Sequence, residues 1–175
     1  AQYAVVKYIR FPITGEDNPI VSISILDLEN IEYRSVHLPD TAYYIPDIVW
    51  QKNSNNLYFV TLNRKQNNWN LYKYDFTTNR GDLVLNDSND SWVDKKSFFT
   101  PNNNGSWTSR GGFSFAIMEN GELVWISEKD GFKHIYRNRL DGRPINQITR
   151  GEWEVNSINA IDANNGIIYF SAKKE

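Results

Sequence analysis

The amino-acid sequence predicts an all-β fold of four-stranded antiparallel blades, that is, a partial β-propeller with about three blades or parts of them. The main observation is a repeat of strand, polar turn and strand, which begins at Leu57 and again 66 residues later at Leu123. A third copy begins at Ile167, 44 residues after the second, and the sequence ends inside it. No segment of ten residues shows a helical period of apolar side chains. We therefore expect a piece of a larger ring of blades.

The first half of the chain predicts two groups of strands. Residues 20–28 alternate apolar and polar side chains, and residues 31–38 follow as their hairpin partner across a turn that contains Glu29-Asn30. Further strands are expected, separated by polar turns, at 44–50, 57–62, 70–76 and 82–85.

The second half predicts a four-stranded meander and the start of another. Its hairpin signals are Asn120-Gly121 and Asp141-Gly142, and its strands are expected at 113–117, 123–127, 133–138 and 145–149, then at 154–160 and 167–171. We predict blade units at residues 1–38, 43–85 and 113–151, the start of a further unit at 152–175, and a loop or insertion at 86–112. A β-sandwich has similar turn spacing and stays as the alternative architecture.

The composition limits the kinds of partner. Hydrophobic residues make up 40% and aromatic residues 14% of the chain, which is enough for a packed core. The net charge of −2, from 19 basic and 21 acidic residues, gives no basic surface for nucleic acid. No apolar run is long enough for a membrane-spanning helix, no signal peptide is visible, and cysteine is absent. We expect neither a nucleic-acid partner nor a membrane segment in this chain.

The sequence offers no recognisable catalytic set and no cofactor or metal site. There is no Gly-x-Ser-x-Gly motif, and the only histidines are His37 and His134. We expect His134 to make structural hydrogen bonds within a strand. The carboxylates fall mostly in turns, where they accept backbone N–H bonds. The segment Asn86-Asp87-Ser88-Asn89-Asp90 is only a loose imitation of a calcium loop, because it lacks the glycine and the final glutamate.

Three segments carry a resemblance to a known family. They are Arg-Phe-Pro-Ile-Thr-Gly-Glu-Asp-Asn-Pro at 10–19, Ser-Glu-Lys-Asp-Gly-Phe-Lys-His-Ile-Tyr at 127–136, and Ile-Thr-Arg-Gly-Glu-Trp-Glu-Val at 148–155. All three resemble segments in the propeller of dipeptidyl peptidase IV-like serine peptidases, of the prolyl oligopeptidase superfamily, and they occur in the same order.

The resemblance implies an eight-bladed propeller stacked on an α/β-hydrolase domain that removes dipeptides from peptide N-termini. The catalytic Ser, Asp and His of that family lie in the hydrolase domain, and its amine-binding glutamates precede the segment that this chain resembles. We therefore expect a non-catalytic propeller segment, inactive alone, from a parent enzyme of proteolysis. Its expected partners are the hydrolase domain of the parent chain and, in the full enzyme, a peptide substrate. We also expect the segment to self-associate, and its parent to be periplasmic, secreted or associated with the cell envelope.

The resemblance also suggests residues that line the substrate-access cavity. Trp92-Val93 resembles a Trp-Val pair near an arginine-bearing loop of the family, and Trp107 with Arg110 is a second candidate for that loop. Only one of the two can be in register. Gly111-Gly112 follows Arg110 where the mammalian-type pattern has an aromatic residue and a second arginine.

Two other functions stay open from the sequence. One is a stand-alone β-propeller or β-sandwich interaction module with no hydrolase partner. The other is a sandwich domain that binds glycans through Trp69, Trp107 and Trp125.

Overall fold

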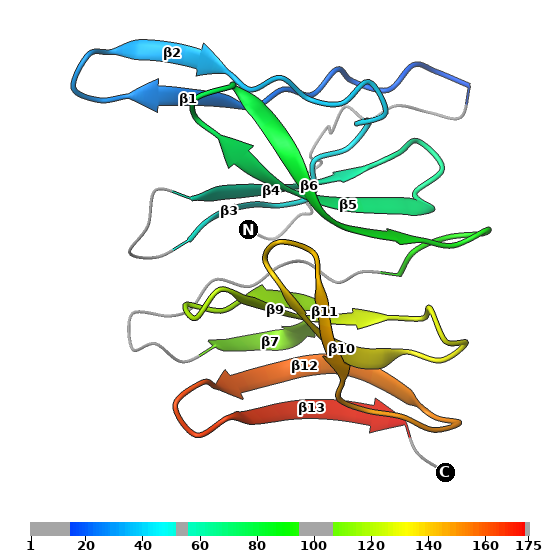
Figure 1. Cartoon of the computed structure of the whole chain (residues 1–175). Helices are drawn as coiled ribbons and strands as arrows, with labels where there is room; N and C mark the ends of the chain where they lie inside the picture. Colours follow the sequence, from blue (N-terminus) through cyan, green and yellow to red (C-terminus); the bar gives the residue numbers. More distant parts are fainter. Residues whose placement is uncertain (1–14, 52–55, 95–106, 174–175) are drawn as a thin grey trace, which may run out of the picture.

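The computed structural model describes residues 15–51, 56–94 and 107–173, with residues 107–113 described by their backbone alone. The secondary structure in these ranges consists of β-strands (Figure 1). The first sheet is a hairpin of β1 (Ser24–Asp27) and β2 (Glu32–Ser35). The second sheet has four strands in the order β3 (Ile48–Trp50), β4 (Leu57–Leu62), β5 (Asn68–Asp75) and β6 (Arg80–Ser88).

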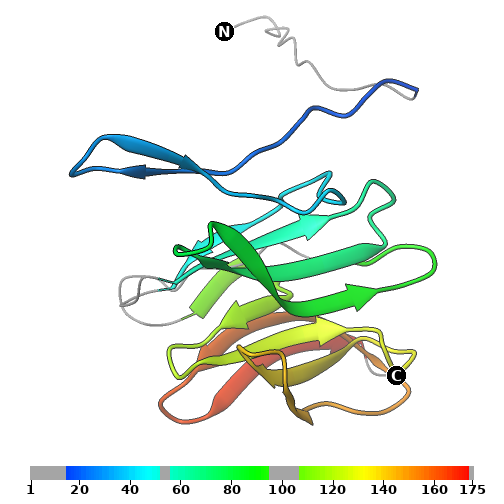
Figure 2. The same cartoon turned by 45° about the horizontal axis from the view of Figure 1, so that its top comes forward.

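The second half of the chain forms two further antiparallel sheets. One is a four-stranded meander of β8 (Phe115–Ile117), β9 (Glu122–Ser127), β10 (His134–Arg139) and β11 (Pro144–Gln147). The other has three strands, with β12 (Glu154–Asp162) between β13 (Ile167–Lys173) and β7 (Trp107–Phe113). Among the described residues, two four-stranded sheets, one three-stranded sheet and one two-stranded hairpin fit the predicted partial propeller. The sheets follow one another down the molecule (Figure 1 and Figure 2).

Each of the two four-stranded sheets is buried on both faces because it lies between neighbours. Side chains alternate between faces along a strand, so Leu57 and Phe59 of β4 join the core beneath the β1–β2 hairpin, whereas Tyr58 and Val60 join the core against the next sheet. A third core lies between the β8–β11 sheet and β12. This two-sided burial distinguishes stacked blades from a two-layer sandwich, in which each sheet has one solvated face.

A close contact fixes how the two four-stranded sheets meet. The turn between β10 and β11 brings Gly142, at φ +86°, so close to β6 that an added Cβ would lie 2.5 Å from the Val84 carbonyl oxygen. The Asn138 side chain donates to the Gly142 carbonyl at 3.1 Å and accepts from Trp125 Nε1 at 2.9 Å. The Asp141-Gly142 turn predicted from the sequence is therefore also a contact between blades.

The segment predicted as a loop, 86–112, has strand at both ends. β6 continues to Ser88 because it stays paired with β5, and the Asn86 amide donates to the side chains of Asn68 and Asn70 at 2.9 and 2.7 Å. β7 pairs with β12, about 50 residues further along the chain, rather than with its sequence neighbour β8. The blade boundaries themselves stay predictions.

Candidate functional site

The predicted site residues lie in two places. Trp92 follows β6, at the end of the second sheet that also carries the turn between β4 and β5. We call this the Trp92 end, and the opposite end of the same sheet, where β3 leads toward β4, the Trp50 end. Trp107 and Arg110 lie in β7, and their side chains are outside the described part of the structure.

The backbone around Trp92 is tied to its own sheet. The N–H groups of Asn89 and Val93 donate to the carbonyls of Asn67 and Gln66, both at 3.0 Å. Val93 is buried in the core between the two four-stranded sheets, whereas Trp92 is 53% exposed. The anchored neighbour therefore turns the indole outward, with its Nε1 at 3.5 Å from Gln66 Oε1.

The turn beneath this segment is held by its own side chains. Asn63 Oδ1 accepts from the backbone N–H groups of Asn67 and Asn68 at 3.0 and 3.1 Å, and Asn63 Nδ2 donates to Asn67 Oδ1 at 2.8 Å. An asparagine that replaces backbone partners in this way fixes a turn. The segment that carries Trp92 is therefore hydrogen-bonded to a turn whose own conformation is fixed.

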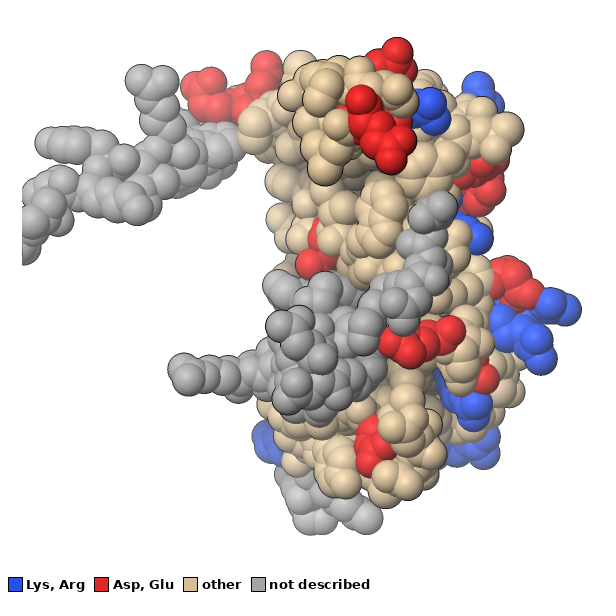
Figure 3. Space-filling view, turned by 90° about the vertical axis from the view of Figure 1, so that its left-hand side faces the viewer, with Lys and Arg blue, Asp and Glu red and all other residues tan. Residues whose placement is uncertain are grey.

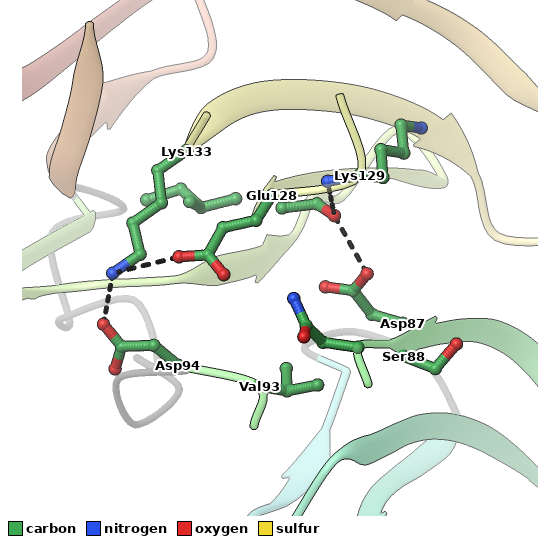
Figure 4. A pocket seen from close by; sticks show the side chains of 10 residues that line it. Asp87, Ser88, Val93, Asp94, Glu128, Lys129 and Lys133 are labelled. Atoms are coloured by element: carbon green, nitrogen blue, oxygen red, sulfur yellow. Dashed lines mark hydrogen bonds and ion pairs between the residues drawn. The ribbon is translucent and has the colours of Figure 1, made fainter. Parts of the chain in front are cut away.

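A small pocket lies next to Val93 and Asp94, between the second sheet and the β8–β11 sheet (Figure 4). Its lining comes from the end of β6, from the 89–94 segment and from the hairpin between β9 and β10. The Ser127 hydroxyl donates to Asp87 Oδ1 at 2.9 Å and accepts from the Lys129 N–H at 3.2 Å. The Lys133 ammonium bonds the Asp94 carboxylate and lies 3.4 Å from Glu128 Oε1. Hydrogen bonds and ion pairs between the lining residues therefore connect the second sheet to the β8–β11 sheet.

Lys133 stays a cation in this pocket. Burial alone lowers the pKa of its ammonium, but the hydrogen bond and charge of Asp94, with the charge of Glu128, outweigh burial and raise that pKa. A lysine with a raised pKa does not serve as a base near neutral pH. Its chemistry here is an ion pair.

One serine and one histidine face each other in the ladder, but they do not form a catalytic pair. Ser127 is the register partner of His134. His134 Nε2 lies 2.9 Å from the Gly151 carbonyl, to which it must donate, and Nδ1 lies 3.1 Å from Thr149 Oγ1. Thr149 Oγ1 in turn accepts from the Ile135 N–H at 2.9 Å. Because both ring nitrogens are engaged and the Ser127 proton goes to Asp87, neither residue is available for acyl transfer.

Three further aspartates make hydrogen bonds within their own turns. The pKa values of Asp27, Asp75 and Asp162 are lowered by hydrogen bonds from the turn residues that follow each of them. Within the described ranges, no group of three or more His, Cys, Asp or Glu side chains is placed to hold a metal ion. No helix there could cross a bilayer.

The glycan hypothesis does not fit the burial of its tryptophans. Trp69 and Trp125 are 1% and 2% exposed and lie in the core between the two four-stranded sheets. Neither ring can stack on a sugar. Both side chains pack in the core between the two sheets.

A wider cleft, of about 830 Å³, lies at the Trp50 end between the β1–β2 hairpin and the second sheet. Exposed apolar side chains line much of it, Leu28 and Tyr33 among them. Figure 3 views this end, where acidic and basic side chains are interspersed and most of the basic ones lie toward one edge. The hairpin carboxylate Asp27 is used in its own turn, where Oδ1 accepts from the Glu29 N–H at 2.8 Å. The cleft has the character of an uncovered packing surface rather than of a reaction site.

The comparisons with known proteins agree with this fold. The model of the family described as "Dipeptidyl peptidase IV (DPP IV) N-terminal region" matches residues 1–175. The chain belongs to this family. A probable dipeptidyl-aminopeptidase B of Coccidioides posadasii is 28% identical over 99% of the chain, and dipeptidyl peptidase 4 of Arthroderma otae is 25% identical over 95%. The chain spans about a fifth of the length of these relatives, 19% and 20% respectively.

Solved structures show the same architecture. The crystal structure of Porphyromonas gingivalis dipeptidyl peptidase 4 aligns with a TM-score of 0.70 and 30% identity, over 86% of this chain and 20% of that one. A putative dipeptidyl aminopeptidase IV from Bacteroides ovatus aligns at 0.69 and 18% identity, over 98% of this chain and 25% of that one, which supports the fold alone. The family resemblance and the partial propeller predicted from the sequence are confirmed.

The Asp94–Lys133 pair is not among the site residues predicted from the sequence. Lys133 belongs to the hairpin that carries the family resemblance, but 39 residues separate it from Asp94. The adjacent Trp92-Val93 pair is the sequence feature that identifies this segment, but it does not identify the ion pair that holds the segment in place.

Proposed function

We propose that the chain forms part of the wall of the substrate-access cavity in a dipeptidyl peptidase IV-like serine exopeptidase. The reaction itself takes place in a separate hydrolase domain of the full-length protein. In this role the chain binds no cofactor. It contributes shape and side chains that select short or unfolded peptides.

The observation that carries the proposal is the contrast between Trp92 and Val93. Large apolar side chains exposed on an ordered segment are a feature of binding surfaces. Trp92 is a half-exposed ring on a segment whose neighbouring residues are buried or hydrogen-bonded.

Kinetics of the full-length protein test this role. Trp92→Ala should raise KM for peptide substrates and leave kcat nearly unchanged, because it removes binding that substrate and transition state share. The matched control is Trp50→Ala, which removes a tryptophan of similar exposure (50%) at the opposite end of the same sheet. Unchanged KM in Trp92→Ala, or an equal rise in both variants, rejects the proposal.

The second candidate loop is decided by the same assay. Since only one of Trp92 and Arg110 can be in register with the family loop, Arg110→Ala and Trp107→Ala should have little effect if Trp92 is the contact. A rise in KM that is confined to Arg110→Ala assigns the role to β7 instead.

A further inference from the structure

The segment that presents Trp92 is attached to two different sheets. On its own sheet, backbone hydrogen bonds from Asn89 and Val93 reach the turn at 63–68. At its other end, the Asp94 carboxylate accepts a hydrogen bond from the ammonium of Lys133, which lies in the hairpin between β9 and β10 (Figure 4). The orientation of Trp92 therefore depends on how two blades are joined.

The position of Lys133 is itself fixed by its contacts. Its side chain is only 19% exposed, and its backbone carbonyl accepts from the Val155 N–H of β12 at 2.8 Å. Glu128 lies 3.4 Å from the same ammonium, on the side of its own hairpin. Through backbone and side chain together, Lys133 links the Trp92 segment, its own hairpin and the next sheet.

A second lysine of the same pocket makes different contacts. The Lys129 ammonium lies over the rings of Tyr136 and Trp125, 3.9 and 5.2 Å from their centroids. These rings belong to its own sheet. Lys129 is therefore a natural control, with the same charge and the same hairpin but a different partner.

We propose that Lys133 is a positioning residue for peptide binding, which acts by holding Asp94 and thereby the place of Trp92. This inference rests on the proposed role of Trp92 in the cavity wall. It adds that the ion pair between Asp94 and Lys133, which joins two blades, determines the position of the Trp92 indole.

Amide hydrogen exchange on the full-length protein tests the anchor without any substrate. Lys133→Met should speed exchange of the Val93 N–H, which donates to Gln66, about two- to fivefold, the range expected for a partly exposed ion pair. Lys133→Arg should restore slow exchange, and Lys129→Met should leave it unchanged. Asp94→Asn removes the negative charge of the same ion pair from its more exposed side, and it covers the case in which Lys133→Met does not fold. Wild-type exchange in both Lys133→Met and Asp94→Asn overturns the proposal.

Kinetics of the full-length protein test the consequence for peptide binding. Lys133→Met should raise KM about two- to fivefold with kcat unchanged. In a Trp92→Ala background the same change should add nothing, because the side chain that it positions is gone. An equal rise in KM with and without Trp92 overturns the positioning role.

The two assays separate failure of this inference from failure of the proposed function. Wild-type kinetics of Trp92→Ala reject the cavity role of Trp92, and with it any role of Lys133 in peptide binding. Faster Val93 exchange in Lys133→Met would then show an anchor that serves the fold alone. Wild-type exchange together with altered Trp92→Ala kinetics would reject the anchor and keep the cavity role.

Discussion

Gly142→Ala should destabilise the chain by about 2–5 kcal/mol. Gly142 has φ +86°, where an alanine costs about 1–2 kcal/mol, and the new Cβ would lie 2.5 Å from the Val84 carbonyl oxygen in the neighbouring sheet. Backbone on both sides must shift to relieve that contact, which adds about 1–3 kcal/mol as in other overpacked sites. The free energy of unfolding, from urea titration followed by far-UV circular dichroism, measures the change.

Gly121→Ala is the matched control. Gly121 has φ +79° in the turn between β8 and β9, but nothing lies within 4 Å of an added Cβ. It should show only the backbone strain of about 1–2 kcal/mol. The difference between the two variants, about 1–3 kcal/mol, isolates the contact between blades. Equal losses in both variants would refute the stacking of β6 against the turn between β10 and β11.

Three further predictions concern the core, the pH response and the exposed sheet. Thr149→Val should cost about 2–4 kcal/mol, because it leaves the Ile135 N–H and a histidine nitrogen without their buried partner, and urea unfolding checks it. Hydrogen bonds from Arg143 lower the pKa of Asp141 to about 2, so the stability from this pair should be present above about pH 4 and be lost as pH falls toward 2. Arg143→Met should raise the pKa of Asp141, which an NMR titration measures. The chain should self-associate in light scattering, and Tyr169→Lys on half-exposed β13 should shift it toward monomer, whereas a concentration-independent monomer would contradict this.

Most strands could be predicted from local pattern. β4 at Leu57–Leu62 is predicted residue for residue, because an apolar run between polar turns leaves few alternatives. β7 was missed, since its partner β12 is remote in sequence and Gly111-Gly112 weakens its strand pattern. Strand formation there depends on a neighbouring sheet edge that no local window contains.

The candidate site was predictable only in part. The family resemblance pointed to Trp92, and the structure adds the reason for its exposure, which is the burial of Val93. The structural role expected for His134 agrees with its two hydrogen bonds. The Asp94–Lys133 pair could not be found from sequence, because two charged residues among 40 have no pattern that identifies them as partners. Tertiary packing alone brings them together.

Substrate protection of a thiol at position 92 tests the central claim most directly. The chain contains no cysteine, so Trp92→Cys and Trp50→Cys each add one thiol to it, at opposite ends of the same sheet. In the full-length protein, maleimide labelling of each position is followed by peptide mapping, with and without a saturating peptide. The account predicts that the peptide slows labelling at position 92 and not at position 50. Labelling at position 92 that is unaffected by the peptide would contradict it.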